Sequence, residues 1–338
     1  MRPCVSVIIP VYNASRVIGP TVKTIQGQTL KDIEILLVDD GSTDDTLSLL
    51  RTLAGEDARI RVEAQRNAGV FAARNAGLSL AEGEYVYVCD QDDFLHPRAL
   101  EYFVWACKRY GIELLSFWNR ECADGHVPTF ADVPTFEEIP ICRPGPITDD
   151  TSAAEYCRCL KAVRLDVWTQ FMSMDLAKSD LYVGRYDTSR VFRLIKSAKS
   201  WALTRFPEFY CYNREPAGSM VKSCLRASTI EAIHDDLVRM GDVFAEDRSS
   251  GDIYGVWETV RRCFISRVVK MQVNAVRRRN GSMSPAERHL AKVSLANEIH
   301  DLKKRGYTRF SDMNVLNALR CLVLDWRHAG SAARGTGA

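Results

Sequence analysis

The sequence predicts an α/β fold, with a parallel sheet in the first two thirds of the chain and a helical region after it. Two apolar, β-branched segments, residues 5–9 and 33–38, have the nearly continuous hydrophobicity of strands that helices cover on both faces. Residues 17–25, between them, and residues 47–53, after the second, repeat apolar side chains at helical spacing. From about residue 226 onward helical spacing dominates, which predicts a β-α-β-α unit followed by helices.

Composition and charge divide the chain into three expected parts. These are an α/β domain at residues 1–225, an α-helical region at 226–328, and a Gly- and Ala-rich tail at 329–338 that we expect to be disordered. Residues 257–338 hold 16 Lys and Arg against 6 Asp and Glu, a net charge of +10, which leaves −8 for the rest of a chain whose net charge is +2. With 338 residues, 46% of them hydrophobic, the chain can bury a large core.

Two acidic clusters follow strand-like segments of the α/β domain. Asp39 and Asp40 end the second strand, and residues 90–93, Asp-Gln-Asp-Asp, follow a later one. Ligands of parallel sheets bind beyond the carboxyl ends of the strands, so we expect the two clusters to converge. Three carboxylates within four residues repel one another unless a cation compensates, which predicts a divalent metal beside a bound nucleotide. Ser42 or Thr43 is expected as the N-cap of the helix that follows, with Asp44 and Asp45 in its first turn. The alternative for the first cluster is that it serves only as turn and cap chemistry.

A dinucleotide site is the rival interpretation of an acid that ends a second strand. The first strand continues into Pro10-Val11-Tyr12-Asn13-Ala14-Ser15, which lacks the glycines that let a backbone approach a pyrophosphate. The sequence therefore argues against NAD binding.

The N-terminal region resembles the family 2 glycosyltransferases, which have the Rossmann-like GT-A fold of nucleotide-diphospho-sugar transferases, and in particular the sugar transferases of bacterial capsule, lipopolysaccharide and exopolysaccharide synthesis. Six segments match in order: residues 5–13, 38–46, 67–69, 73–78, 81–86 and 90–97. The clear match covers the first third of the chain, and a looser one extends to about residue 220. The resemblance implies a GT-A catalytic domain at 1–225.

The resemblance also implies roles for the donor-side residues. Tyr12 would contact the nucleobase through its ring, Asp40 would accept a base N–H, and Pro10 would form the neighbouring wall. Arg74 would lie near the base and the diphosphate. These roles imply a nucleotide-sugar donor, for which we expect UDP.

The segment Asp90-Gln91-Asp92-Asp93 matches the family's Asp-x-Asp pair. The resemblance places Asp90 by the ribose and makes Asp92 the ligand of Mn²⁺ or Mg²⁺, with phosphate oxygens of the donor completing the shell. Asp93 has two interpretations that stay open: a residue supporting the metal ligands, or an N-cap for the helix that Pro97 opens.

Asp187 matches the family's general base, which deprotonates the acceptor hydroxyl, although Tyr186 replaces the usual preceding glutamate. The alternative is a helix N-terminal acid, because a helix is expected from Thr188 onward. The resemblance implies an inverting, metal-dependent transfer of one sugar to a glycan or lipid-linked hydroxyl. No Gln-x-x-Arg-Trp motif follows, which argues against a processive synthase.

Two other function classes remain. A non-catalytic sugar-nucleotide-binding or scaffold protein of a glycan assembly complex is favoured only by Tyr186. A metal-dependent phosphoryl-transfer enzyme would need a Gly-rich phosphate loop with lysine, which the sequence lacks.

The basic runs Arg277–Arg279 and Lys303–Arg305 indicate either contact with an anionic membrane or acceptor, or solvated helix faces and homo-oligomer contacts. Nucleic acid is not expected as a partner, since no nucleic-acid-binding motif accompanies the charge. Eleven scattered cysteines predict reduced thiols. Because neither a 20-residue apolar stretch nor a signal-peptide core is found, we expect a cytoplasmic protein, with peripheral contact at the inner membrane face through the basic helices.

Two expectations concern the middle of the chain. Five prolines between Asp124 and Asp150 predict a long surface loop. Trp168 and Phe171 are expected in the core, with stacking on a sugar as the alternative.

Overall fold

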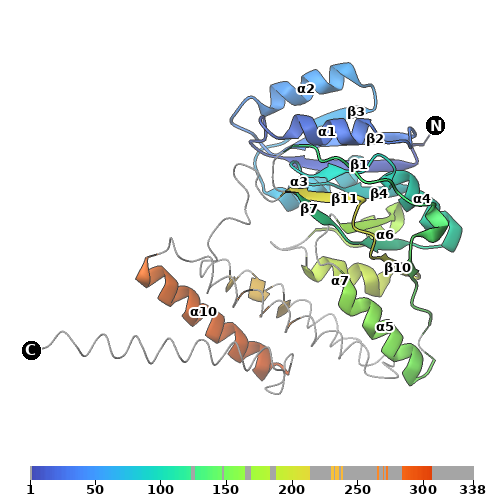
Figure 1. Ribbon diagram of the computed structural model, residues 1–338. Helices are drawn as coiled ribbons and strands as arrows, with labels where there is room; N and C mark the ends of the chain where they lie inside the picture. Colours follow the sequence, from blue (N-terminus) through green and yellow to red (C-terminus); the bar gives the residue numbers. More distant parts are fainter. Residues whose placement is uncertain are drawn as a thin grey trace, which may run out of the picture. The chain divides into compact units, whose positions relative to one another are not determined.

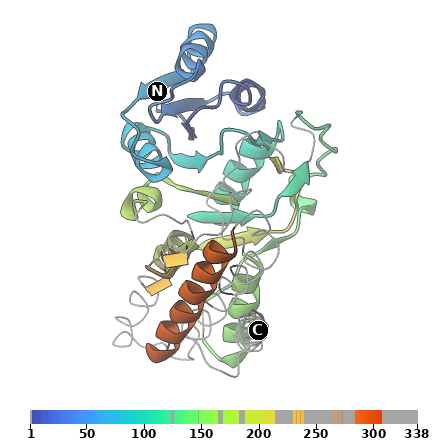
Figure 2. The ribbon, with the colours of Figure 1, turned by 90° about the vertical axis from the view of Figure 1, so that its left-hand side faces the viewer.

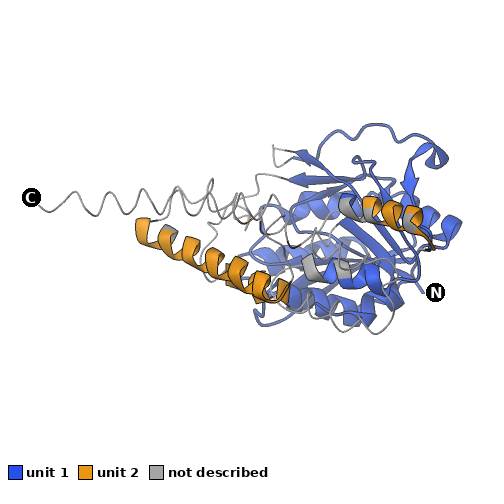
Figure 3. Ribbon diagram, turned by 90° about the horizontal axis from the view of Figure 1, so that it is seen from below, with its two compact units in different colours: residues 1–147, 162–183, 187–217 blue, residues 148–161, 184–186, 218–338 orange. Residues whose placement is uncertain are grey.

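The computed structural model describes residues 2–122, 126–146, 148–163, 169–182, 188–213 and 284–306, with single residues and short runs between 230 and 272. The chain divides into two compact units. Unit 1 comprises residues 1–147, 162–183 and 187–217, and unit 2 comprises 148–161, 184–186 and 218–338 (Figure 3). The tail at 329–338 lies outside the described residues.

Unit 1 is built on a mixed, mostly parallel sheet (Figure 1). Its eight described strands, in spatial order, are β3 (Ile60–Ala64), β2 (Ile33–Asp39), β1 (Val5–Val11), β4 (Tyr85–Val88), β9 (Gln170–Ser173), β6 (Leu114–Phe117), β10 (Trp201–Thr204) and β8 (Ile141–Cys142). The predicted α/β fold is confirmed.

The directions of the strands decide which ends lie together. β1 pairs in parallel with β2 and β4, and every residue of β1 and β2 is buried, as their unbroken hydrophobicity predicts. β9 is antiparallel to both β4 and β6, so these two run the same way, and β10 is parallel to β6. The carboxyl ends of β1, β2, β3, β4, β6 and β10 therefore lie along one edge of the sheet.

The helices of unit 1 follow the predicted alternation. They are α1 (Ile18–Gln26), α2 (Thr46–Glu56), α3 (Val70–Leu80), α4 (Ala99–Tyr110), α6 (Met174–Ser179) and α7 (Thr188–Ser197). The α3 helix packs on β1 and β2 so closely that a Cβ on Gly77 would come 2.4 Å from Ile8 Cγ2. The expected start of α2 was wrong. Its N-cap is Asp45, because the Asp44 carboxylate accepts the backbone N–H of Thr46 at 3.1 Å and keeps residues 42–44 in the loop.

A three-stranded sheet, in the order β5 (Phe94–Leu95), β11 (Tyr210–Asn213), β7 (Arg120–Cys122), joins segments far apart in the sequence. The region expected to be one long loop is more structured, since it contains β8 and a 3₁₀ helix, η1 (Phe136–Glu138), and the α5 helix (Asp150–Ala162) begins at its end. Phe171 is fully buried in β9, which confirms the core interpretation, whereas Trp168 lies outside the described residues.

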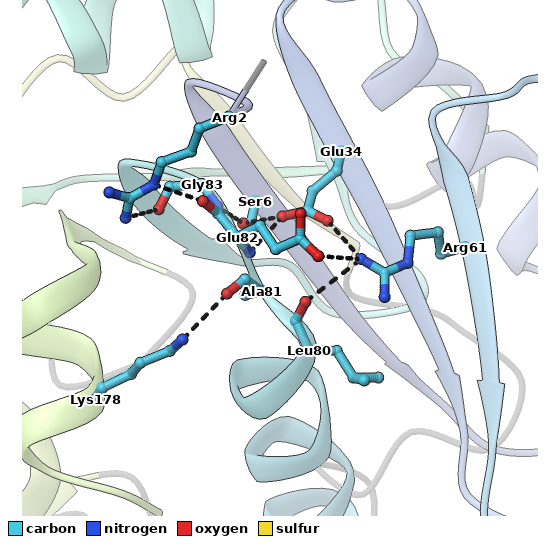
Figure 4. Close-up of polar contacts among 9 residues, drawn as sticks. All are labelled: Arg2, Ser6, Glu34, Arg61, Leu80, Ala81, Glu82, Gly83 and Lys178. Carbon is cyan, nitrogen blue, oxygen red and sulfur yellow. Dashed lines mark hydrogen bonds and ion pairs between the residues drawn. The ribbon is translucent and has the colours of Figure 1, made fainter.

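The matching segment at residues 81–86 has a structural role at the amino-terminal edge of the sheet (Figure 4). Glu34 Oε1 accepts the Ser6 hydroxyl at 2.6 Å and the backbone N–H of Glu82 at 2.7 Å, and Arg61 pairs with Glu34 Oε2 at 3.2 Å. The N–H of Gly83 donates to Ser6 Oγ at 2.8 Å, and a Cβ there would come 2.6 Å from that oxygen. These contacts fix where β4 begins, and hence where the acidic segment after it ends up.

Unit 2 contains the helix α10 (Pro285–Lys304), drawn in red in Figure 2. Ser284 and Glu287 form a reciprocal capping box at its start. Its buried hydrophobic residues repeat at helical spacing: Ala291, Leu295, Ile299 and Leu302. The α-helical region expected from residue 226 onward thus contains α10, and residues 307–328 of that region lie outside the described residues. No helix in the described part of the chain has the length and apolarity needed to cross a membrane.

The expectation of reduced thiols was wrong for two cysteines. Cys142 and Cys159 each take part in a disulfide bond. The free thiols among the described residues are Cys4, Cys89, Cys107, Cys122 and Cys211.

Candidate active site

The predicted site residues of unit 1 gather at the carboxyl-terminal edge of the sheet. Pro10 and Tyr12 come from the end of β1, Asp40 follows β2, and Asp90 follows β4. Asp92 lies two residues further along that loop. The spatial order β2-β1-β4 makes these strand ends neighbours, so the topology brings the two acidic clusters together.

Tyr12 presents an aromatic ring at this edge. Its side chain is 44% exposed, while Pro10 before it is buried in β1. Asn13 adopts a left-handed backbone conformation, φ 47°, which asparagine tolerates better than most residues, and its side-chain oxygen accepts the N–H of Thr43 at 2.8 Å. The loop after β1 is thus fixed to the loop after β2, and the Tyr12 ring is held outward.

Asp40 is buried, with 3% of its surface exposed, and both oxygens are engaged. Its Oδ1 accepts the side-chain N–H of Gln65 at 2.7 Å and the backbone N–H of Ala68 at 2.9 Å, and its Oδ2 accepts the N–H of Gly69 at 2.8 Å. The matching segment 67–69 therefore serves to hold this carboxylate. The close approach requires glycine at position 41, where φ is 71° and a Cβ would come 2.7 Å from the backbone N of residue 67.

Arg74 and Asp90 form an ion pair at the base of the site. The Arg74 guanidinium donates to Asp90 Oδ1 at 3.0 Å, and only 5% of the Arg74 side chain is exposed against 28% of Asp90. A buried cation beside a partly exposed carboxylate suits the diphosphate and ribose of a nucleotide.

Asp92 lies in surroundings that disfavour its ionised form. Burial, assisted by the charge of Asp90, raises the pKa of Asp92 to about 7. A divalent cation would relieve this destabilisation of the ionised form. Among the described residues no group of three or more His, Cys, Asp or Glu side chains is arranged as a metal site. Asp90 and Asp92 supply two carboxylates, and a Mg²⁺-type site uses one or two carboxylates and takes the remaining ligands from phosphates and water.

Sequence reasoning missed the role of Gln91, the variable position of the Asp-x-Asp pair. Its side-chain oxygen accepts the backbone N–H of Tyr12 at 2.8 Å, and its backbone oxygen accepts the Thr21 hydroxyl at 3.0 Å. The sequence offered one signal for this role, which is the position of Gln91 between Asp90 and Asp92.

Of the two interpretations of Asp93, the N-cap was wrong, and the support of the metal ligands stays a prediction. The N-cap of α4 is Arg98, with no side-chain cap bond, so Asp93 is not the cap. Its carboxylate instead accepts the Tyr210 hydroxyl and the N–H of Asn213 at 2.8 Å. Burial raises the pKa of Asp93 well above its usual range, with the charges of Asp90 and Asp92 adding to the effect. Asp93 ties the acidic segment to β11.

Asp187 and Tyr186 lie outside the described residues, and α7 begins immediately after Asp187. The buried Arg190 of α7 stacks over the Tyr182 ring, with the guanidinium carbon 3.9 Å from the ring centroid. The guanidinium of Arg74, which pairs with Asp90, lies 5.4 Å from the centroid of the same ring. Arg190, in the first turn of α7, and Arg74, the partner of Asp90, therefore both lie against the ring of Tyr182.

Comparison with known proteins supports the resemblance to the family 2 glycosyltransferases. The family model "Glycosyl transferase family 2" matches residues 6–167. The chondroitin synthase of Pasteurella multocida is 40% identical over 99 residues, which are 29% of this chain and 10% of that protein. Glycosyltransferase GlyG of Streptococcus pneumoniae is 34% identical over 129 residues, 37% of this chain and 43% of that protein. The matched segments thus span less than half of these relatives.

Two solved structures share the fold. S. aureus TarS superposes with a TM-score of 0.64 at 18% identity, covering 95% of this chain and 53% of that one. The mannosyltransferase PcManGT from Pyrobaculum calidifontis, solved with GDP-Man and Mn²⁺, gives a TM-score of 0.52 at 15% identity, covering 96% and 88%. Fold, ordered motifs and family match agree: residues 6–167 match the family 2 glycosyltransferases, and the chain shares the GT-A fold of the solved structures.

Proposed function

We propose that the protein transfers one sugar from a nucleotide-diphosphate sugar to a hydroxyl of a glycan or lipid-linked acceptor, with inversion at the anomeric carbon. The observation that carries this is the convergence of the exposed Tyr12 ring, buried Asp40 and the Arg74–Asp90 pair at neighbouring strand ends. An aromatic face, a hydrogen-bond acceptor and a buried cation are the groups that a nucleoside diphosphate needs.

A UDP-sugar is the donor we propose. A TarS fragment has been solved with UDP-GlcNAc, and PcManGT with GDP-Man, which supports a nucleotide-sugar donor of this class. Within the described residues Asp40 Oδ2 accepts a single hydrogen bond, from Gly69, so a lone pair remains for the ring N–H of uracil. Pro10, which is buried in β1, would border this position.

The metal we propose is Mn²⁺ or Mg²⁺, held by Asp92 with Asp90 beside it. PcManGT was solved with Mn²⁺, which supports the proposal. When bound, the ion would neutralise charge that grows on the leaving diphosphate.

Asp187 is the base we propose for the acceptor. Its carboxylate takes the proton of the acceptor hydroxyl while that oxygen bonds to the anomeric carbon and the bond from this carbon to the diphosphate oxygen breaks. Attack from the face opposite the diphosphate inverts the configuration. The stacking of Arg190 on Tyr182, and of Tyr182 on Arg74, supports a position of the α7 start near the donor.

Residues 1–225 would form the catalytic domain, and we propose that the basic helices of 226–328 contact an anionic membrane at its inner face, the acceptor, or a second copy of the chain. The net charge of +10 at residues 257–338 supports this. Sedimentation with anionic vesicles, before and after removal of the Arg277–Arg279 charges, measures the membrane contact, and unchanged sedimentation would leave the acceptor and oligomer roles.

A thermal-shift screen over nucleotide sugars, with and without Mn²⁺, tests the proposed donor. A ligand that binds the folded state alone stabilises by about 2.7 kcal/mol at 100 times its Kd. We expect the largest shift with UDP-sugars plus metal, followed by detectable donor hydrolysis. Binding without hydrolysis or transfer would favour the sugar-nucleotide-binding scaffold, and the absence of any shift would overturn the donor site.

A further inference from the structure

The aromatic ring of Tyr182, in the segment that follows α6, lies against the guanidinium groups of two arginines. The guanidinium carbon of Arg190, on α7, is 3.9 Å from the ring centroid, and that of Arg74, on α3, is 5.4 Å from it. Both distances are within the range of a cation–π contact. Arg74 also pairs with Asp90 at 3.0 Å. One ring therefore joins the cation of the proposed donor site to α7.

Asn75, the neighbour of Arg74 on α3, holds the main chain of Tyr182 through two hydrogen bonds. Its side-chain nitrogen donates to Tyr182 O at 2.9 Å, and its side-chain oxygen accepts the backbone N–H of Tyr182 at 2.9 Å. The two residues are 107 positions apart in the sequence. A side-chain amide can donate and accept at once, whereas a carboxylate can only accept. The pair of bonds fixes the position of Tyr182 relative to the helix that carries Arg74.

Arg190 fixes the surroundings of the ring from α7. Its side chain is 2% exposed, and its guanidinium donates to Asp180 O at 2.8 Å and to Ala177 O at 3.1 Å. These carbonyl groups lie at the carboxyl-terminal end of α6. Arg193, on the same helix α7, pairs with the Asp180 carboxylate at 2.9 Å. Because a buried guanidinium is stable only with such partners, Arg190 has a determined position, and Tyr182 packs on a fixed surface.

Phe71 and Tyr182 form an aromatic pair against which Arg74 lies. The two ring centroids are 5.7 Å apart, and the Arg74 guanidinium carbon is 5.7 Å from the centroid of Phe71. Only 5% of the Arg74 side chain is exposed. An arginine that is already ordered loses less side-chain freedom when it binds an anion, which corresponds to about three- to tenfold in affinity.

We propose that Tyr182 is a positioning residue for Arg74, and that Asn75 holds Tyr182 in place for this role. The ring keeps the guanidinium turned towards Asp90, so that the diphosphate of the donor meets a cation whose direction is already set. Tyr182 acts through Arg74 rather than on the donor. The proposal rests on the proposed donor site, and it adds to that site the segment after α6, which the donor assignments leave out.

The binding experiment compares UDP with uridine, which has the same base and ribose but no phosphate, on the full chain with Mg²⁺. Tyr182→Leu removes the ring, so UDP binding should weaken about three- to tenfold, while uridine binding should change by less than about twofold. Tyr182→Phe keeps the ring and should retain most of the wild-type affinity for UDP. Calorimetric titration measures UDP binding, and ligand-observed NMR measures uridine binding.

Two variants of α3 accompany these. Asn75→Ala releases the main chain of Tyr182 and leaves its ring in place, so it should weaken UDP binding in the same direction as Tyr182→Leu. Ser79→Ala is the matched control, because the exposed Ser79 hydroxyl donates to Ala76 O within the same helix, and it should bind UDP as the wild type does. If Tyr182→Leu fails to fold, Asn75→Ala decides the outcome. Equal weakening of UDP and uridine binding would show a structural role alone and overturn the proposal, as would unchanged UDP binding.

Unfolding in urea without any ligand tests the same relationship independently of UDP. Arg74 contacts both Tyr182 and Asp90. The factor by which Asp90→Ala changes the unfolding equilibrium constant should therefore differ by about threefold or more between the wild-type background and the Tyr182→Leu or Asn75→Ala background. Equal factors would overturn the positioning of Arg74 by Tyr182. A wild type that shows this coupling but does not bind UDP would count against the proposed donor site alone.

Discussion

The side-chain oxygen of Gln91 accepts the backbone N–H of Tyr12 at 2.8 Å, which joins the middle of the acidic segment to the residue with the exposed ring. The two lie 79 residues apart in the sequence. The position of Tyr12, whose ring we propose to contact the nucleobase, therefore depends on the position of the loop that carries Asp90 and Asp92.

Replacing Gln91 with Met should weaken UDP binding in the presence of Mn²⁺ by up to about tenfold, because the Tyr12 N–H loses its acceptor while side-chain volume is kept. Gln91→Asn keeps an amide oxygen and adds no charge beside Asp90 and Asp92, so it is the control for the loss of the amide. Isothermal titration with UDP measures both. Wild-type affinity in Gln91→Met would show that the Tyr12 loop holds its place without this bond.

The donor assignments predict different losses for two acids. Asp92→Asn turns a carboxylate ligand into a neutral amide, so the gain in UDP affinity that Mn²⁺ provides should fall sharply, while UDP binding without metal should persist. Asp40→Ala should weaken UDP binding even without metal, since it removes the proposed base acceptor and releases Gln65, Ala68 and Gly69. If both variants bind UDP plus Mn²⁺ as the wild type does, the donor site lies elsewhere.

Asp187→Asn is the sharpest test of the proposed base. Asn caps a helix about as well as Asp, so α7 should keep its start, but it accepts no proton, and transfer should fall by about 10²-fold or more. Donor binding should survive. The readout is single-turnover transfer to the true acceptor with UDP affinity as the control, and full activity would leave Asp187 as a helix N-terminal acid only.

We predict that the stability of unit 2 depends on pH because of the buried carboxyl group of Glu298. It is buried on α10, with Gln272 donating to its Oε2 at 3.0 Å, and burial raises the pKa of Glu298 to about 8. The folded state therefore binds a proton that the unfolded chain releases near pH 4.5, so the stability is full below that pH and falls as pH rises towards 8. Glu298→Gln, which keeps the bond to Gln272, should flatten this dependence and raise the free energy of unfolding at pH 8.5 by a few kcal/mol, on the order expected for a shift of this size.

Urea unfolding of both proteins at pH 5 and pH 8.5 measures the effect. An equal fall in stability for wild type and Glu298→Gln would mean that other groups cause it.

Gly83→Ala should destabilise the protein by about 1–3 kcal/mol, because the new Cβ would meet the backbone N and the hydroxyl of Ser6, each at 2.6 Å. Gly55→Ala is the control. Nothing lies within 4 Å of its Cβ position in α2, so it should be neutral or stabilising by about 0.5–1 kcal/mol. Thermal unfolding of both variants measures the difference in stability. An unchanged stability of Gly83→Ala would show that the residues around Ser6 move to accommodate the new Cβ.

The sequence predicted those strands and helices that depend on interactions within a single segment of the chain. β1, β2, α4 and α10 appeared because their periodicity reflects burial within a single segment. It did not predict β8, which exists through pairing with β10 some 60 residues later, or the start of α2, where Asp44 captures Thr46. The hydrogen bonds of Asp93 could not be predicted for the same reason, since its partners lie 117 and 120 residues away in the sequence.

The distance in sequence between Asp93 and β11 bears on how the protein matures during synthesis. Asp93 leaves the ribosome more than a hundred residues before Tyr210 and Asn213, the groups that accompany its burial. Until β11 adds to β5 and β7, a carboxylate in this position is better solvated than buried, so the acidic loop gains its final shape only when the long-range pairing closes. We therefore expect a chain that ends before β11 to lack the final arrangement of the acidic segment, because both partners of the Asp93 carboxylate would be missing.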